Sequence, residues 1–198
     1  MADWSSEHHG IDPDGVPFVR GWLRLVHVVA TPLVALRVPP DAVTLAGLLF
    51  SLAVPVLAGT GLPVWAVAAV LVSVLLDGLD GAVALRTDRV SSHGRALDSA
   101  CDRVSELAWW VALVLGAGVP WWCAVVLAVL TLVPEGWRAR TGRLGVLTVW
   151  ERPTRTILVV VGLVSVGLHL GLVTGLVGVA LAAVGAAQLV RAVRRQGS

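Results

Sequence analysis

The chain has 198 residues, of which 57% are apolar and only 14% are charged. Soluble domains carry roughly 25% charged residues, so this composition indicates an integral membrane protein rather than a soluble one. The formal net charge of +2 is too small to indicate a nucleic-acid-binding protein, and no basic run supports one.

The first 38 residues come before the long apolar stretches. Residues 1–16 are polar and acidic and lack the basic start and apolar core of a signal peptide, which predicts a flexible cytosolic tail. Residues 17–38 mix arginines with apolar side chains, so we expect an amphipathic juxtamembrane helix at the interface, ended by Pro39 and Pro40. A seventh, tilted span is the alternative interpretation of this segment.

Six later stretches approach the roughly 20 mainly apolar residues that a transmembrane helix needs. The predicted fold is therefore an all-α integral membrane protein, in which six transmembrane helices follow the amphipathic helix and form one domain over residues 39–195. The boundary between the last two is the weakest, because "HLGLVTGLVG" interrupts the pattern only slightly. The predicted spans are 41–57, 62–85, 96–115, 120–137, 154–168 and 172–190.

The connections between these spans differ in charge. The connections "AGTG", "GAGVP" and "GLVTG" carry none, whereas the other two connections and the C-terminal end are rich in arginine. Basic loops face the cytoplasm, so six spans place both termini on the cytosolic side of the plasma membrane, and an odd number would scatter the arginines. An aromatic belt then predicts Trp65, Trp121 and Trp122 at the outer interface, and Trp137 and Trp150 at the inner one.

Four aspartates lie at the cytosolic ends of the second and third predicted spans. Asp77 and Asp80 are three residues apart and Asp98 and Asp102 are four apart, so each pair shares one face of its helix. The short connection makes the two helices antiparallel, and the pairs can then meet. Carboxylates buried without partners are costly, and hard cations such as Mg²⁺, Mn²⁺ or Ca²⁺ prefer oxygen ligands. We therefore expect a divalent-cation site, and no cysteine–histidine set argues for zinc.

The segment "DGLDGAVALRTDRVSSHGRALDSACD" resembles the signature of the CDP-alcohol phosphotransferases, Asp-x₂-Asp-Gly-x₂-Ala-Arg-x₈-Gly-x₃-Asp-x₃-Asp. The likeness extends to "PPDAVTLAGLL" before the first span and to "ERPTR" at the start of the fifth. Two positions depart from the family pattern, because Leu85 replaces its arginine and Asp41 an expected asparagine. The positions that match in identity and spacing are Asp77, Asp80, Gly81, Ala84, Gly94, Asp98 and Asp102.

The resemblance implies an enzyme of phospholipid biosynthesis. Such an enzyme transfers a substituted phosphate, here expected to be phosphatidyl, from a CDP-linked lipid such as CDP-diacylglycerol to an acceptor alcohol and releases CMP. By the resemblance, Asp77, Asp80 and Asp98 would hold two Mg²⁺ ions, or Mn²⁺ in their place, on the donor diphosphate. Asp102 would also bind metal and act as the catalytic general base.

The resemblance also suggests how substrates bind. The predicted CDP-binding residues are Thr44, Gly81, Ala84, Arg86 and Gly94. Arg86 stands one place beyond the family's arginine, about 100° further around a helix, so it reaches a phosphate only if the helix frays.

The phosphatidylinositol phosphate synthases of the family suggest that Arg152 and Arg155 grip an acceptor phosphate, and Arg138 is a third candidate. Positive-inside anchoring is the alternative role for these arginines. The acceptor stays open among a small polyol, a polyol phosphate such as inositol phosphate or glycerol phosphate, and a lipid alcohol such as phosphatidylglycerol. Family members are often homodimers, which makes a homodimer an expectation.

Two other functions compete with this one. A membrane prenyltransferase also binds a diphosphate through Mg²⁺, but its aspartate motifs lie far apart on a longer chain. A divalent-cation transporter would use the carboxylates as a conduction site. It predicts further charged residues deeper in the membrane and toward the opposite face, whereas the outer connections here are uncharged.

Overall fold

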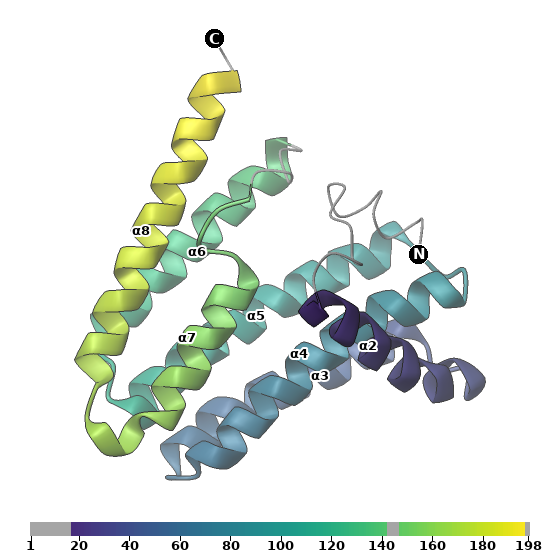
Figure 1. Cartoon of the computed structure of the whole chain (residues 1–198), viewed down its shortest axis with the longest axis horizontal. Helices are drawn as coiled ribbons and strands as arrows, with labels where there is room; N and C mark the ends of the chain where they lie inside the picture. Colours follow the sequence, from purple (N-terminus) through teal and green to yellow (C-terminus); the bar gives the residue numbers. More distant parts are fainter. Residues whose placement is uncertain (1–16, 142–146, 197–198) are drawn as a thin grey trace.

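Every regular element in the described part of the chain is helical (Figure 1). The computed structural model describes residues 17–141 and 147–196. The predicted tail over residues 1–16 therefore lies outside the described residues. In chain order the elements are α2 (Pro17–Ala35), α3 (Pro40–Gly59), α4 (Pro63–Arg86), α5 (Ser92–Ala117), α6 (Trp121–Thr141), α7 (Arg152–Val164), the 3₁₀ turn η2 (Val166–Leu168) and α8 (Gly171–Gln196).

Each predicted span falls on a helix, and the differences at the ends have local causes. α5 begins four residues before the predicted start because the hydroxyl of Ser91 accepts a hydrogen bond of 2.9 Å from the backbone N–H of Gly94 and caps the helix. The fifth predicted span is divided, since α7 ends at Val164 and η2 continues to Leu168. His169 follows with a φ of 52°, which turns the chain toward α8.

Three helices, α3, α4 and α8, are long and apolar enough to cross a membrane by length and composition alone. α5 and α6 have 26 and 21 residues but carry charged side chains, α5 in its first half and α6 near its end, and α7 has only 13 residues. The structure thus supports a helical membrane protein. The count of six spans and the interfacial position of α2 stay predictions.

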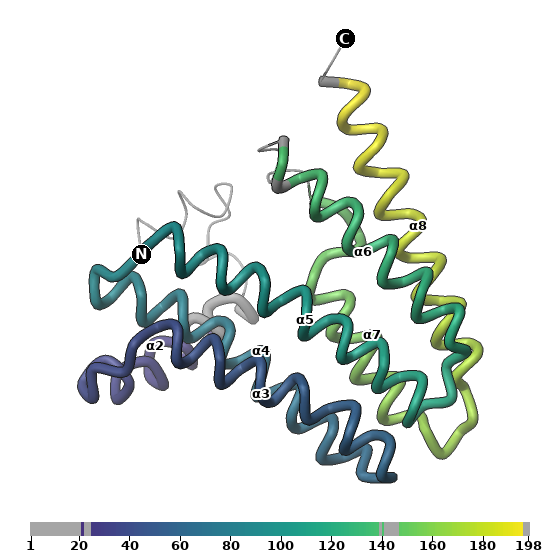
Figure 2. Tube along the Cα trace, turned by 180° about the vertical axis from the view of Figure 1, so that it is seen from behind, coloured from purple at the N-terminus to yellow at the C-terminus, as the bar shows by residue number. Residues whose placement is uncertain are grey.

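The helices form two groups that meet at α5 and α7. α3 packs against both α4 and α5, and α2 lies against α4 (Figures 1 and 2). α6 runs beside α8, while α7 contacts α4, α5 and α8. Close approach of α3 and α5 depends on a glycine, because a Cβ at Gly116 would lie 2.7 Å from the Cβ of Ala58. The main core fills the space between these helices and centres on Trp109, Trp110 and Leu113.

One tryptophan of the predicted aromatic belt lies in the core instead. Trp150 is only 4% exposed, its ring stacks on that of Trp110 with the centroids 6.0 Å apart, and its Nε1–H donates to Thr131 Oγ1 at 2.9 Å. Its burial has a physical reason, since a tryptophan can lie inside once its N–H finds a partner. Trp65 and Trp121 are 65% and 70% exposed, and their position at the outer interface stays a prediction.

Candidate metal centre and nucleotide cavity

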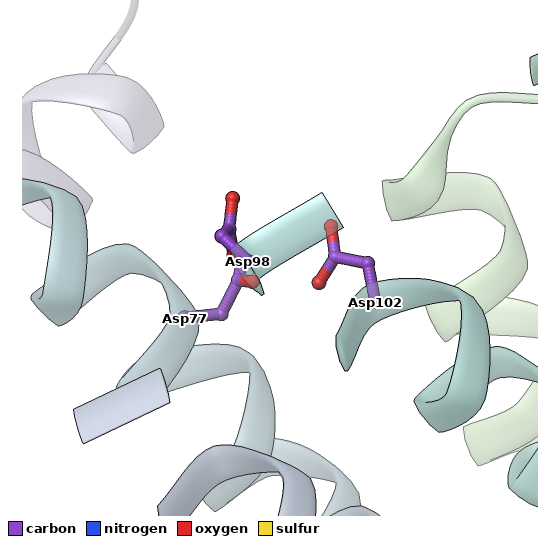
Figure 3. Close-up of side chains that lie close together, drawn as sticks. All are labelled: Asp77, Asp98 and Asp102. Atoms are coloured by element: carbon purple, nitrogen blue, oxygen red, sulfur yellow. The ribbon is translucent and has the colours of Figure 1, made fainter. Parts of the chain in front are cut away.

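Three of the four predicted metal ligands converge on one point. Asp77 of α4 and Asp98 and Asp102 of α5 each offer a carboxylate oxygen, and these oxygens lie within 4.8 Å of one another. Figure 3 shows the three side chains reaching toward one another from two helices. The buried Oδ1 of Asp98 has no hydrogen-bond partner among the described residues. An all-oxygen donor set that contains an unsatisfied oxygen fits a hard divalent cation.

Asp80 lies beside this group and is held by protein donors. One of its oxygens accepts a hydrogen bond of 2.5 Å from Thr44 Oγ1, and the other accepts one of 2.6 Å from the backbone N–H of Gly81. Asp80 still lines the same small cavity as Asp77 and Asp102. Thr44, predicted for the nucleotide pocket, therefore also fixes the direction of a carboxylate.

The two aspartate pairs meet with the help of α3. α4 and α5 are joined by residues 87–91, but they hardly touch each other, and α3 packs against both. The contact of α3 with α4 is close at Gly47, where a Cβ would lie 3.4 Å from the Cβ of Leu76. A short connection alone therefore does not bring the carboxylates together; α3 sets the separation that their side chains bridge.

Among the described residues, Arg152 forms ion pairs within the aspartate cluster, the name we give to Asp77, Asp80, Asp98 and Asp102. Arg152, the first residue of α7, places its Nη1 at 2.6 Å from both Asp77 Oδ1 and Asp102 Oδ1. Its charge offsets part of the repulsion among the aspartates. Of the three arginines predicted to bind the acceptor phosphate, Arg152 is the one that the structure brings to the cluster.

A cavity of about 240 Å³ opens beside the aspartates. Asp80 and Asp98 line it, as do the predicted residues Thr44, Gly81, Ala84 and Gly94. A Cβ added at Gly81 would meet nothing within 4 Å, so this backbone is open to the cavity. The cavity accordingly joins the metal candidate to an open stretch of helix backbone that a ligand can approach closely.

Arg86, also predicted to bind CDP, lies outside this cavity. Its Nη1 donates to His27 O and to Thr31 Oγ1, both at 3.1 Å, and so fastens α4 to α2. The helix stays regular to Arg86 and does not fray before it, which keeps the side chain on the α2 side. Leu85 lines the cavity instead.

Sequence reasoning did not assign three further charged residues to the cavity. Arg89, Arg95 and Asp41 contribute to its lining. In the sequence, the two arginines lie in a basic connection that predicts orientation, and Asp41 stands where the family has an asparagine. The signal for Arg89 and Arg95 is their position in the chain between the two aspartate pairs, whereas Asp41 is distant in the sequence and is brought to the cavity by α3.

A second group of charges lies on the α6 side of the cluster. Arg155 Nε is 3.0 Å from Glu106 Oε1, and Arg155 Nη1 is 3.5 Å from Glu135 Oε1. The side chains of Arg155 and Glu106 are only 5% and 3% exposed. We call this group the ion network; its members are Arg103, Glu106, Glu135, Arg138, Glu151 and Arg155.

Arg138 belongs to the ion network rather than to the aspartate cluster. It donates to Glu151 Oε1 at 3.1 Å and to Thr148 Oγ1 at 3.3 Å, while the N–H and hydroxyl of Thr148 both donate to Glu151 at 2.8 Å. Burial alone raises the pKa of Glu151, but the hydrogen bonds from Arg138 and Thr148 outweigh it and hold the pKa below its ordinary value. Glu151 is therefore ionised at neutral pH and forms an ion pair with Arg138.

Glu135 was not singled out from the sequence, although it contacts three arginines of the ion network, Arg103, Arg138 and Arg155. Its signal is visible in "LTLVPEGWR", where an acid interrupts an apolar helix three residues before Arg138. An ionisable residue in such a stretch is expected to have a partner.

Known proteins resemble this chain in sequence over much of its length. The profile of the CDP-alcohol phosphatidyltransferase family matches residues 37–190. Archaetidylinositol phosphate synthase of Aeropyrum pernix is 39% identical over 106 residues, which cover 49% of this chain and 53% of the relative. Phosphatidylinositol phosphate synthase of Mycobacterium marinum is 33% identical over 153 residues, which cover 70% of this chain and 64% of the relative. The chain thus spans between about half and two thirds of the length of these curated relatives.

Solved structures show the same fold. Phosphatidylinositol phosphate synthase of Mycobacterium tuberculosis in complex with manganese and citrate superposes with a TM-score of 0.73 at 24% identity, over 84% of this chain and 87% of that one. The same enzyme with CDP-DAG bound superposes with a TM-score of 0.70 at 26% identity, over 85% of this chain and 91% of that one.

Proposed function

The chain belongs to the CDP-alcohol phosphatidyltransferase family, and from that premise we propose that it transfers a phosphatidyl group from a CDP-linked lipid, such as CDP-diacylglycerol, to an acceptor alcohol and releases CMP. The observation that carries the proposal is the convergence of Asp77, Asp98 and Asp102 beside a cavity with an open glycine backbone. The solved relative with CDP-DAG bound supports the donor. The inositol phosphate synthases among the relatives make an inositol phosphate our first choice of acceptor.

The metal that we propose is Mg²⁺, with Mn²⁺ as a substitute and two ions as the expected number. Asp77, Asp98 and Asp102 would hold it, with Asp80 at their side. The unpartnered oxygen of Asp98 and the relative in complex with manganese support this assignment. Bound cations would neutralise charge on the donor diphosphate and on the departing CMP.

The residues of the chain supply the remaining chemistry. In the proposed reaction, Asp102 takes the proton from the acceptor hydroxyl. The acceptor oxygen then bonds to the lipid-bearing phosphorus, while the bond from that phosphorus to the oxygen retained by CMP breaks. Arg152, 2.6 Å from Asp102, would grip a phosphate on the acceptor through its forked donors. The side chains of Arg138 and Arg155 are only 6% and 5% exposed within the ion network, whereas that of Arg152 is 21% exposed beside the aspartates, so we assign the acceptor to Arg152.

The cavity is the proposed site for the nucleotide. The open backbone at Gly81 would let the donor approach α4 closely, with Thr44, Ala84 and Gly94 along the same wall. Arg89 and Arg95 line the cavity and are better placed than Arg86 to meet the donor's charge.

We also propose how the protein lies in the plasma membrane. Six spans with α2 at the inner interface would leave both termini and the aspartates on the cytosolic side, and a homodimer is the expected assembly. Single cysteines at Thr60 and Leu147, both exposed in connections, test the orientation. A membrane-impermeant maleimide should label position 60 in intact cells and position 147 only after lysis; the reverse pattern contradicts it.

The activity is tested by release of CMP. Purified protein in detergent receives Mg²⁺, CDP-diacylglycerol labelled in the cytidine, and one acceptor at a time, beginning with inositol phosphate. We expect labelled CMP only when an acceptor is present, and none after chelation of the metal. Absence of CMP with every polyol, polyol phosphate and lipid alcohol, together with cation uptake into proteoliposomes, would establish a transporter instead.

A further inference from the structure

Two helix faces of opposite charge oppose each other between the aspartate cluster and the ion network. On α5, Asp102 and Glu106 are four residues apart, and on α7, Arg152 and Arg155 are three apart. Each pair therefore shares a face of its own helix, where like charges repel. No attractive partner exists within either pair, so each charge finds its counterparts on other helices.

The structure shows this pairing between α5 and α7 as two ion pairs, which we call rungs. Arg152 Nη1 lies 2.6 Å from Asp102, and Arg155 Nε lies 3.0 Å from Glu106. The first rung is partly open, with both side chains 21% exposed, whereas the second is 5% and 3% exposed. Glu135 of α6 holds the same arginine of the second rung at 3.5 Å. The second rung is thus closed to solvent and tied to three helices.

We propose that the Glu106–Arg155 rung positions Arg152 and Asp102 for the acceptor, and that Arg155 is a positioning residue rather than a ligand of the acceptor. The rung fixes the register of α7 against α5. Its polarity matters as well, because a positive charge at position 155 directs Arg152 away from its own helix and toward Asp77 and Asp102. This inference rests on the proposed function, since it concerns how the acceptor arginine and the base are held.

Reversing the rung separates positioning from mere stabilisation. In the double variant Glu106→Arg/Arg155→Glu the two charges still pair across the helices. The glutamate at 155 would now attract Arg152 from three residues away, and the arginine at 106 would attract Asp102 from four residues away. If the ion pair only joins the helices, the reversed pair should keep its activity and Mn²⁺ affinity. If the ion pair orients Arg152 and Asp102, reversal should lower both.

The experiment compares the reversed pair with the neutral pair Glu106→Gln/Arg155→Gln. We expect the reversed pair to lower kcat by about 100-fold, the scale of a small misplacement of reacting groups. We also expect it to weaken Mn²⁺ binding, measured by calorimetry without substrates, by about 10-fold, because groups behind metal ligands have effects of this size. The neutral pair should keep Mn²⁺ affinity and donor KM within about twofold but raise the acceptor KM by about 10-fold, or about 1.4 kcal/mol.

Each outcome decides the proposal. Wild-type acceptor KM and Mn²⁺ affinity in a reversed pair that elutes as a folded protein would overturn it. If the reversed pair does not fold, a wild-type acceptor KM in the neutral pair overturns it equally. The Mn²⁺ measurement needs no turnover, so a wild-type protein that releases no CMP refutes the proposed function while the reversed pair still tests the positioning of Asp102.

Discussion

The aspartate cluster and the ion network use the same kinds of side chain for different ends. The cluster brings four aspartates near one arginine, Arg152, and borders an open cavity. The ion network balances three glutamates with three arginines, and its central pair is almost wholly buried. The two groups therefore differ in net charge and in solvent access rather than in residue type. The cluster is negatively charged and open to a ligand, whereas the ion network is balanced, largely buried and joins helices.

This difference follows from the cost of burying charge. In a balanced, closed group the opposite charges offset part of one another's desolvation cost. A group with surplus negative charge does so only with a cation from outside, and the converging oxygens of Asp77, Asp98 and Asp102 offer ligands for one. Substitutions in the cluster should consequently act mainly on activity, and substitutions in the ion network outside the Glu106–Arg155 pair should act mainly on stability.

The largest expected effect is on turnover, from Asp102→Asn in the cluster. The amide has the same shape but neither takes the acceptor proton nor carries charge to a cation, so we expect CMP release to fall by at least about 10²–10⁴-fold. The thermal midpoint should hardly change, because Arg152 keeps Asp77 as a partner at 2.6 Å. Initial rates and a melting curve in detergent measure the two effects. Wild-type turnover in this variant would remove the assignment of the base.

The converse substitution in the ion network is Glu135→Gln. Glu135 lies 3.4 Å from Arg138 and 3.5 Å from Arg155, so its loss leaves two buried guanidiniums short of charge. Breaking such a contact costs about 3–5 kcal/mol. We expect the thermal midpoint to fall by more than about 5 °C, with Mn²⁺ affinity retained in the folded fraction. Asp88→Asn, at an exposed position in the α4–α5 connection, is the control and should change neither quantity.

The two regions also differ in what the sequence could predict. Asp77, Asp98 and Asp102 were found because helical spacing and a family signature act over a few residues. The sequence did not reveal that α3 separates α4 from α5, because that role depends on contacts between residues distant in the chain. Trp150 and Glu135 show the same limit, because neither residue type nor hydropathy tells which polar group will meet a partner across a helix interface.

A smaller effect depends on pH and concerns Glu151. Its pKa is held below the ordinary value, so its contribution to stability is fully present above the unfolded pKa of about 4.3 and disappears as the pH falls through the lowered value. Glu151→Gln should therefore destabilise the protein by about 1 kcal/mol at pH 7 and by progressively less in acid. Paired melting curves of wild type and variant from neutral to acidic pH check this. A difference that stays constant over the whole range would contradict the ionic role.

The smallest expected effects are on the donor KM, and they test which of two neighbouring residues faces the cavity beside the aspartate cluster. Leu85 lines the cavity, whereas the neighbouring Arg86 bonds to His27 and Thr31 of α2. Leu85→Arg should lower the donor KM by about threefold, since a half-exposed ion pair contributes 1 kcal/mol or less and Arg89 already supplies charge nearby. Arg86→Gln is the matched control and should change the donor KM by less than about twofold, because exposed contacts of this kind contribute little to binding elsewhere.

Initial rates at varied CDP-diacylglycerol and saturating acceptor measure both variants. A tenfold rise in donor KM for Arg86→Gln, about 1.4 kcal/mol, would mean that this side chain leaves α2 to reach the donor. The positive charge near the nucleotide would then come from a residue that the free protein holds in a different place. The cavity would in that case be completed by its ligand, and the contrast between an open cluster and a closed network would hold only before the donor binds.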